Sequence, residues 1–378
     1  MTFGEQLGGK TAFVTGADGM LGSWLVRGLL DRGARVVVLK RDQVAASALA
    51  LDGLEARCQV VRGDLVDAAL MDRAIGEYEV DAVFHLAAQT IVGTANRSPA
   101  STFDSNIRGT WTLMEACRHH GVSQTVVAAS DKAYGPHDTL PYKEDFALQP
   151  KYPYDVSKAA TDLIARSYFH TYGLPVAVTR FANIYGGGDL NPSRLVPEMV
   201  SGILAGRAPV IRSDGSPERD FLYVEDAAAA YLAIADALDR DDDTACGAAF
   251  NAGGEPHSVN EIVDTILRLA GVDLQPEILG TPLPEGTSDR LSLDSSRLRD
   301  LTGWRPEIGL EEGLRRTLRW YRTHPLALDL SYTRTHGRSL QVGRDQAQEG
   351  DRRRAPRQAV HEARASDHGR GEGGRRRP

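Results

Sequence analysis

Short apolar runs alternate with amphipathic stretches along the first part of the chain. The apolar runs are TAFVTG, ARVVVLK, CQVVRGD, DAVFHLAA and QTVVAAS, all between residues 11 and 135. The stretches between them, such as MLGSWLVRGLLDRG, repeat their apolar positions at helical spacing. Strands that are apolar throughout are typical of a parallel sheet whose two faces are covered by helices. The pattern therefore predicts an α/β fold with a doubly wound parallel sheet, continued by a helix over 154–172 and a strand over 175–186.

A second, smaller lobe is predicted after residue 187. There, Pro- and Gly-rich connections separate shorter helical patterns at 259–271 and 310–323. We expect a sheet domain over 1–186, to which part of 220–255 returns, and a smaller α/β lobe that is mainly 187–328.

Residues 331–378 differ in composition from the rest of the chain. They hold twelve arginines, six acidic residues and no lysine, and almost no large apolar side chains. Such a segment cannot bury enough apolar surface to fold, so a disordered Arg-rich tail is predicted. The net charge of −7 leaves about −13 on residues 1–330, which makes nucleic acid an unsuitable partner for the folded part.

Targeting segments, membrane spans and metal-ligand patterns are absent from the sequence pattern. No apolar run reaches the roughly twenty residues of a membrane span, and the start MTFGEQLGGKTAFV lacks the blocks of a signal peptide. Cys58, Cys117 and Cys246 have no Cys or His neighbour at metal-ligand spacing. We therefore expect a cytoplasmic protein with reduced thiols, no membrane contact and no metal.

The segment VTGADGMLG places three glycines between the first strand and the helix that follows it. At this position, Gly16, Gly19 and Gly22 let backbone amides approach a pyrophosphate, which the helix N-terminus stabilises. The segment predicts a dinucleotide site. The further candidates for cofactor binding are Met20, Leu21, Asp42, Asp64, Leu65 and Ala87.

The end of the second strand leaves the choice of dinucleotide open. Asp42 is a candidate for the acid that binds the ribose of NAD, but Lys40 and Arg41 precede it and could hold the 2′-phosphate of NADP. Asp64, at the end of VVRGDL, is placed to meet an adenine, although a helix-capping Asp would look the same.

The helix over 154–172 carries a tyrosine and a lysine four residues apart, on one face. A free tyrosine has a pKa near 10, so Tyr154 needs a nearby cation to act as a base near neutrality. Lys158 can supply that charge and also bond ribose hydroxyls. Spacing alone also fits an ordinary surface pair; together with the glycine motif and Ser130, it predicts a catalytic pair.

These motifs resemble the extended short-chain dehydrogenase/reductase family of nucleotide-sugar enzymes. TGADGMLG, HLAA at 85–88, Ser130 and YDVSK at 154–158 carry the resemblance, which covers about residues 9–325. Within the family, GSWL, SDKAY, YGGGDL and RLVPE resemble the CDP-glucose 4,6-dehydratases. The resemblance implies a Rossmann domain that binds NAD, with Tyr154 as base, Lys158 as its partner and Ser130 bonding the sugar hydroxyl.

The resemblance also implies a substrate, a nucleotide-diphosphate hexose, and a homodimer formed through the segments 106–120 and 154–172. The residues implied in substrate binding are Asn183, Arg194, Arg219 and Arg290. The segment TIVGTANRSP departs from the family pattern beside the sugar, and SPERDFLYVED is closer to the general pattern than to the CDP-glucose version. The nucleotide base and the hexose therefore stay open.

An acid and an amine follow Ser130 directly, where the fifth strand ends. Oxidation of a sugar at C4 acidifies the C5 proton, so that a base at C5 and an acid at the C6 hydroxyl can eliminate water. We assign Asp131 as the acid and Lys132 as the base, each with a pKa shifted by burial. Both reach one substrate only if the strand has broken at Ser130, and the two must point apart or be desolvated separately. Lys132 could instead only hold the sugar or the cofactor.

Two other functions remain open at this point. A nucleotide-sugar 4-epimerase needs the same Ser130, Tyr154 and Lys158 but no chemistry at C6, and its family members usually carry small neutral residues in place of Asp131 and Lys132. A non-catalytic dinucleotide-binding sensor or scaffold would need the glycine motif alone.

Overall fold

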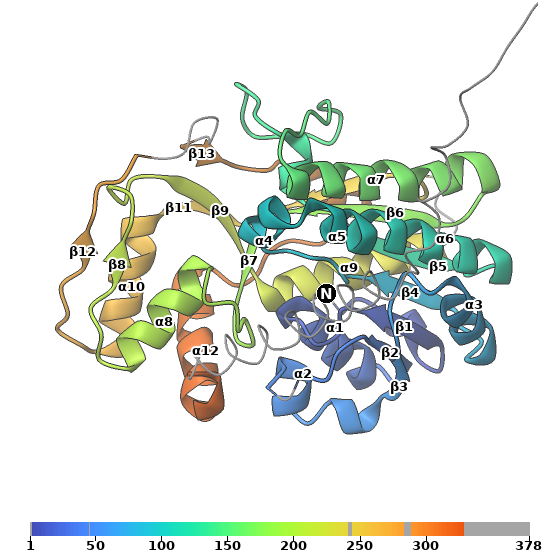
Figure 1. Ribbon diagram of the computed structural model, residues 1–378, viewed down its shortest axis with the longest axis horizontal. Helices are drawn as coiled ribbons and strands as arrows, with labels where there is room; N and C mark the ends of the chain where they lie inside the picture. The colour runs from blue at the N-terminus through green and yellow to red at the C-terminus, as the bar shows by residue number, and fades with distance from the viewer. Residues whose placement is uncertain (1, 45, 241–243, 283–288, 329–378) are drawn as a thin grey trace, which may run out of the picture. The chain divides into compact units, whose positions relative to one another are not determined.

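Seven parallel strands form the central sheet of the computed structural model, which describes residues 2–44, 46–240, 244–282 and 289–328 (Figure 1). Their order across the sheet is β10-β6-β5-β4-β1-β2-β3. The strands are β1 Thr11–Thr15, β2 Arg35–Lys40, β3 Gln59–Arg62, β4 Ala82–His85, β5 Gln124–Ala128, β6 Val176–Phe181 and β10 Ala249–Ala252.

Helices cover both faces of this sheet, as the apolar runs predict. Side chains alternate along a strand, so Ala12 and Val14 join one apolar core while Phe13, between them, joins the other. The first core is closed by α1 Met20–Asp31, α2 Ala48–Leu51 and α9 Val224–Asp239. The second is closed by α3 Ala68–Glu77, α6 Gly109–His120 and α7 Pro153–Tyr172. The predicted doubly wound parallel sheet is confirmed.

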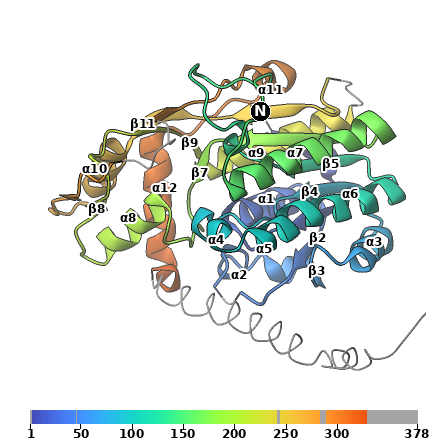
Figure 2. The ribbon, with the colours of Figure 1, turned by 45° about the horizontal axis from the view of Figure 1, so that its top comes forward.

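Short helical segments connect β4 to α6 and complete the layer beside α7. They are α4 Val92–Arg97, α5 Pro99–Phe103 and the single π-helical turn η3 Asp104–Arg108. Figures 1 and 2 show α5 and α6 running beside α7. In the described residues, the 3-10 turns are η1 Glu5–Leu7, η2 Glu55–Arg57, η4 Asp131–Tyr134 and η5 Pro325–Ala327.

The long helix α7 has clear signals at both of its ends. Pro153 occupies its first turn, where a missing N–H costs nothing, and Gly173 ends it in the left-handed region at φ 71°. These ends place Tyr154 in the first turn and Lys158 one turn later.

A second group of strands and helices follows β6. It contains a sheet in which β9 Glu218–Tyr223 pairs with β7 Asn183–Tyr185, β11 Glu255–Ser258 and β13 Arg290–Leu291. A two-stranded sheet joins β8 Val210–Ile211 to β12 Glu277–Ile278. Apolar side chains of α8 Leu195–Leu204, α10 Val259–Ala270 and α12 Leu310–Thr323 form the core beside these sheets, and α11 Ser296–Thr302 packs against α9 and β10.

Residues 1–330 form one compact unit. The proposed boundary near residue 187 stays a prediction, and the tail over 331–378, predicted to be disordered, lies outside the described residues. Among the helices of the described residues, none has the length and apolar character needed to cross a bilayer.

The strand predicted over 175–186 is wrong as a single element. The structure divides it at Ala182, with β6 in the central sheet and β7 beside β9 in the second sheet. Ala182 still donates its N–H to the carbonyl of Ala252, the last residue of β10, whereas Asn183 pairs with Phe221. The sequence pattern is apolar on both sides of the division, so only the identity of the partner strand separates the two pieces.

Candidate active site

The candidate residues gather at the carboxyl edge of the central sheet. The glycine loop follows β1, Lys40 ends β2, and Ser130 follows β5. Carboxyl ends of neighbouring parallel strands lie at one edge, which is where α/β folds of this kind bind their ligands.

The glycine loop is closed too tightly for side chains. Gly16 has φ +75°, and a Cβ on Gly22 would lie 2.2 Å from the Gly16 carbonyl oxygen. Gly19 precedes the first turn of α1, which Met20 and Leu21 begin. The backbone can therefore approach a bound phosphate at the helix N-terminus, and this cradle fits the pyrophosphate of a dinucleotide. Ala87 lies against the loop, since its N–H would be 2.7 Å from a Cβ on Gly16.

The basic residues at the end of β2 are both engaged with acids. The Lys40 amine lies 3.1 Å from Asp18 Oδ1, in the glycine loop, and 2.6 Å from Glu55 Oε2, and its side chain is only 3% exposed. Arg41 forms an ion pair with Asp42 at 2.7 Å. These pairings occupy the two groups that were candidates for a 2′-phosphate, so the geometry favours NAD over NADP.

Asp64 does not cap the helix that follows it. Its Oδ1 accepts a hydrogen bond from the N–H of Val66 at 3.3 Å, while Asp67 caps α3 by accepting from Leu70. The helix-capping interpretation of Asp64 is therefore wrong. Leu65 packs against Gly109 at the start of α6, where a Cβ would lie 2.6 Å from the leucine side chain.

The strand β5 ends three residues before the acid, Asp131. β5 ends at Ala128, Ser130 is extended, and η4 begins at Asp131. Ser130 Oγ donates to Asp131 Oδ1 at 2.8 Å and accepts from the N–H of Lys132 at 3.2 Å. The strand has thus ended before the pair, as predicted.

The acid and the amine differ strongly in burial. Asp131 is 3% exposed, and its Oδ2 has no hydrogen-bond partner in the described part of the chain. The Lys132 side chain is 37% exposed, and its amine lies 3.9 Å from Asp131 Oδ2, beyond hydrogen-bond distance. The two groups are therefore desolvated to different degrees but do not point fully apart.

A network of buried hydrogen bonds holds η4 in place. The Tyr134 hydroxyl donates to Asn251 Oδ1 at 2.7 Å and accepts from Arg180 Nη1 at 3.1 Å. Arg180 also makes two hydrogen bonds to the carboxylate of Asp162 in α7, at 2.7 and 3.0 Å. Because these groups are buried and paired, the turn that carries Asp131 is held by β6, β10 and α7 together.

Tyr154 and Lys158 are both buried on α7. Burial raises the pKa of Tyr154 to about 12, the negative charge of Asp131 adds to this, and Arg194 and a hydrogen bond with Ser130 oppose it. Burial lowers the pKa of Lys158 to about 8, and its amine donates to the carbonyl of Ala128 at 2.7 Å. The expected lowering of the tyrosine pKa is therefore not provided by the protein alone.

Asp131 is also surrounded by acids that sequence reasoning missed. Burial raises the pKa of Asp155 to about 6, Lys132 opposes the rise, and Asp131 adds to it. Burial also raises the pKa of Asp220 to about 6, with a further rise from Asp131. Asp155 lies inside the YDVSK motif, so its place near the site could have been predicted from the sequence. Asp220, on β9, has no local sequence signal.

Three of the four predicted substrate residues lie on adjacent strands of the second sheet. Asn183 is on β7, Arg219 on β9 and Arg290 on β13. Arg219 is close enough to Asp131 for the two charges to interact, although burial, the larger effect, lowers the arginine pKa. Arg290 is largely exposed and forms an ion pair with Glu218 at 2.8 Å.

The fourth, Arg194, precedes α8 and is oriented by Asp189 at 3.1 Å. Its charge acts on Tyr154. The structure therefore brings Arg194 and Arg219 to the predicted catalytic residues, and leaves Arg290 at the surface.

The chain is similar in sequence to proteins described as dTDP-glucose 4,6-dehydratases. The chain is 32% identical over 335 residues to a dTDP-glucose 4,6-dehydratase of Xanthomonas campestris pv. campestris, covering 83% of this chain and 93% of the relative. It is 33% identical over 318 residues to a dTDP-glucose 4,6-dehydratase of Streptomyces antibioticus, covering 82% and 91%.

Solved structures of similar fold include dehydratases and epimerases. A dTDP-glucose 4,6-dehydratase from Streptomyces venezuelae with NAD bound matches with a TM-score of 0.72 at 31% identity, covering 83% of this chain and 97% of that one. A UDP-glucose 4-epimerase from Thermotoga maritima with UDP-glucose matches with a TM-score of 0.75 at 28% identity, covering 83% and 99%.

The model of the NAD dependent epimerase/dehydratase family matches residues 12–253. The Rossmann-type sheet and the predicted membership of the extended short-chain dehydrogenase/reductases are confirmed, as is an enzyme that depends on NAD. The family match spans more than half of the chain, and relatives above 30% identity cover four fifths of it. This protein therefore belongs to the NAD dependent epimerase/dehydratase family.

Proposed function

We propose that this protein is a nucleotide-sugar 4,6-dehydratase, which converts a nucleotide-diphosphate hexose to the 4-keto-6-deoxy sugar. The observation that carries the proposal is the buried carboxylate of Asp131, which keeps one oxygen without a hydrogen-bond partner among the described residues and lies beside Tyr154. Oxidation at C4 alone has no use for such a group. Elimination of water from C5 and C6 needs an acid there.

The first step is oxidation at C4. Tyr154 takes the proton of the C4 hydroxyl, Ser130 holds that oxygen by a hydrogen bond, and Lys158 contributes positive charge from the same helix face. Bound NAD, held by the glycine loop, supplies the hydride acceptor at C4 and the hydride donor at C6. The pKa of about 12 for Tyr154 in the protein alone already includes the opposing charge of Arg194, so the phenolate needs further stabilisation once cofactor and substrate are bound.

The second step is the loss of water. Lys132, in its neutral form, removes the C5 proton that the C4 ketone has acidified, and the C5–H electron pair forms the C5–C6 double bond. Asp131, in its protonated form, gives its proton to the departing C6 hydroxyl. Hydride then adds to C6 and a proton returns to C5 from Lys132. The net change is the loss of one water.

The nucleotide base of the substrate is the finer part of the proposal. We infer CDP, on the resemblance of SDKAY and YGGGDL to the CDP-glucose enzymes. The similar proteins named above act on dTDP-glucose by their descriptions. Assays with CDP-glucose and dTDP-glucose in separate reactions distinguish the two nucleotides.

A second candidate function is 4-epimerisation, because a UDP-glucose 4-epimerase is among the structures of similar fold. An epimerase would return the hydride to C4 rather than C6. Its product would keep the mass of the substrate.

The test is to incubate the purified protein and NAD with CDP-glucose, dTDP-glucose, UDP-glucose and GDP-mannose separately, and to measure product mass. Loss of one water from CDP-glucose is the expected result. Loss of water from dTDP-glucose alone would show that the proposed nucleotide, CDP, is wrong and would support the proposed dehydratase activity. A sugar isomer of unchanged mass would establish the epimerase and overturn the proposed role of Asp131.

The proposed assembly is a homodimer formed through α6 and α7. Trp111 on α6 and Leu163 on α7 are large apolar side chains that are 45% and 58% exposed in the single chain. Pairing these helices with a second copy would bury them. Sedimentation of the wild type against Leu163→Glu measures this, with a shift from dimer to monomer expected.

A further inference from the structure

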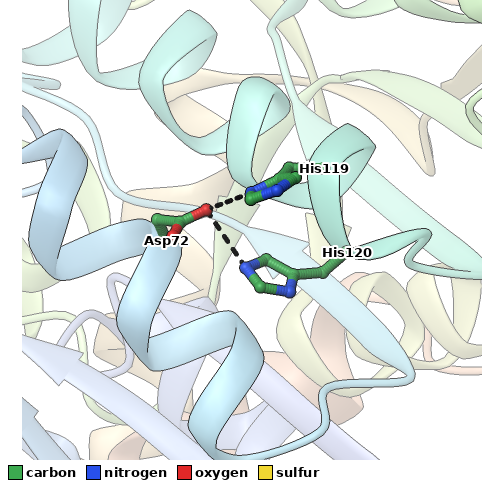
Figure 3. Close-up of side chains that lie close together, drawn as sticks. All are labelled: Asp72, His119 and His120. Atoms are coloured by element: carbon green, nitrogen blue, oxygen red, sulfur yellow. Dashed lines mark hydrogen bonds and ion pairs between the residues drawn. The ribbon is translucent and has the colours of Figure 1, made fainter.

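A cluster of two histidines and one aspartate lies outside the candidate active site. Asp72 is on α3, and His119 and His120 are the last two residues of α6, which packs against α3 (Figure 3). None of the three contacts the residues of the proposed reaction. The cluster has no role in that reaction, and we ask what its donor atoms can bind.

The two imidazole rings converge on one carboxylate oxygen. His119 Nδ1 lies 2.6 Å from Asp72 Oδ1, and His120 Nε2 lies 3.1 Å from the same oxygen. Both histidines lie in the last turn of α6, which Gly121 ends in the left-handed region. The ring centroids are 4.7 Å apart.

The neighbouring helix leaves room for one of the rings. A Cβ on Gly76 of α3 would lie 2.6 Å from His120 Cε1, so only glycine there lets the ring lie against α3. Gly76 and Asp72 both lie on α3, so this contact holds the His120 ring of α6 beside Asp72. The position of at least one imidazole is therefore set by packing as well as by its hydrogen bond.

The donor set is one that transition metals prefer. Each residue offers one ligand atom, and these atoms lie within 4.8 Å of one another. Zinc bonds of about 2.0–2.2 Å to nitrogen and oxygen put the ligands of a tetrahedral shell roughly 3.3 Å apart. The two histidine–aspartate separations, 2.6 and 3.1 Å, would change by less than about 1 Å, and the separation of the two histidine nitrogens, at most 4.8 Å, by up to about 1.5 Å. All three side chains are at least partly exposed, so they can move and water can complete the shell.

We propose that Asp72, His119 and His120 form a binding site for a divalent transition metal, with Zn²⁺ as the representative ion and water as the remaining ligand. The metal would join α3 to α6 on the face of the sheet that these helices cover. The proposal is independent of the proposed function, because the site contains none of its residues.

The ligands of this site have no short spacing in the sequence that would predict it, since Asp72 is 47 residues from His119. Only the packing of α3 on α6 brings the third ligand to the histidine pair.

The test is calorimetric titration of ZnCl₂ into the full chain, loaded with NAD and free of any affinity tag. We expect one site in the wild type and at least a tenfold loss of affinity in each of Asp72→Asn, His119→Ala and His120→Ala. The matched control is His257→Ala, which removes a histidine that has one carboxylate partner, Glu261 at 2.9 Å, and no second imidazole in the cluster. Its affinity should equal that of the wild type.

The triple variant decides between this site and the rest of the chain. His336, His361 and His368 lie beyond the described residues and remain in every variant. If the triple variant Asp72→Asn, His119→Ala and His120→Ala titrates like the wild type, the proposal is wrong. A cobalt titration gives a second readout: a thiolate charge-transfer band would assign the metal to a cysteine and overturn the proposal as well.

A thermal scan measures the consequence for the fold. Metal that binds only the folded protein raises its melting temperature. We expect Zn²⁺ to raise the melting temperature of the wild type and of His257→Ala, and not that of Asp72→Asn. An equal rise in Asp72→Asn would count against the aspartate as a ligand.

Discussion

Two clusters of acids and amines lie at the carboxyl edge of the central sheet, and they are held in opposite ways. At the end of β2, the Lys40 amine is paired with two carboxylates at 2.6 and 3.1 Å. After β5, the Lys132 amine is 3.9 Å from Asp131, whose Oδ2 has no hydrogen-bond partner among the described residues. The first amine is fixed by two close carboxylates, whereas the second amine and its acid are not fixed by a hydrogen bond to each other. Under the proposed function, the same residue types serve structure at one strand end and chemistry at the other.

The largest effect is expected at the loosely paired cluster, from Asp131→Asn. Asparagine keeps the shape and can still accept the hydrogen bond from Ser130, but it has no acidic proton for the C6 hydroxyl. We expect formation of the keto-deoxy sugar to fall about 10³-fold, within the range for removal of a general acid. Reduced cofactor should still form, because C4 oxidation does not use Asp131.

Product mass and absorbance of the reduced cofactor measure the two steps separately. The control is Asp138→Asn, an exposed aspartate on the loop after η4, which should behave as the wild type. Equal loss of both steps in Asp131→Asn would mean that the carboxylate acts before elimination, and the distinction drawn between the two clusters would fail.

The second largest effect is expected from Lys132→Met. Methionine removes the amine but keeps the length of the side chain, so exchange of the C5 proton with solvent should fall about 10²-fold. Deuterium incorporation at C5 from D₂O is the measurement, and the exposed Lys143→Met is the control. Incorporation at the wild-type rate would show that Lys132 only holds the sugar or the cofactor.

A smaller effect is expected at the fully paired cluster, from Lys40→Met. The change leaves the carboxylate of Asp18, in the glycine loop, without its cation at 3.1 Å, and that charge repels a pyrophosphate. We expect NAD affinity to fall about tenfold, which corresponds to about 1.4 kcal/mol. Titration of cofactor-stripped protein with NAD and with NADP measures the change.

A double variant identifies the cause of that loss. Adding Asp18→Asn to Lys40→Met removes the unbalanced charge and should restore most of the NAD affinity. If Lys40 were instead a ligand of the 2′-phosphate, Lys40→Met would weaken NADP and spare NAD.

The smallest effect concerns the charge beside Asp131. The pKa of Asp155 is raised to about 6, mainly by burial. An acid whose pKa rises on folding lowers stability as the pH rises from its unfolded value near 4 through 6, because the folded protein then resists its ionisation. Asp155→Asn removes this cost, so its free energy of unfolding relative to the wild type should increase by about 1 kcal/mol from pH 4.5 to pH 7, after allowance for solvent screening.

Urea unfolding of both proteins at the two pH values measures this difference. A difference that does not change with pH would show that Asp155 ionises normally in the folded protein. Ionisation of the acids around Asp131 would then cost less free energy than their burial indicates.

The fold was predictable where local pattern decides it. Apolar runs with helices between them predict the central sheet, and the parity of Ala12, Phe13 and Val14 assigns each to its core. The division of 175–186 at Ala182 was not predictable, because the sequence pattern does not distinguish β6 from β7, and the two strands differ only in the strands with which they pair.

The candidate site divides in the same way. The glycine loop and the Tyr154–Lys158 spacing are local, and the sequence alone predicts them. The pairing of Lys40 with Glu55, and the approach of Asp220 to Asp131, arise from chain segments that meet only in the folded protein. Their effects on pKa and on cofactor choice therefore needed the structure.

The hydrogen bond between Tyr134 and Asn251 also imposes an order on folding during synthesis. Its partners are 117 residues apart. Asn251 also donates from its side chain to the carbonyl of Tyr142 at 3.0 Å, and from its backbone N–H to Glu144 Oε1 at 2.8 Å. β5 and the turn after it leave the ribosome long before β10 exists. The segment that carries Asp131 and Lys132 therefore completes its native contacts late, once β10 has been made and has joined the sheet.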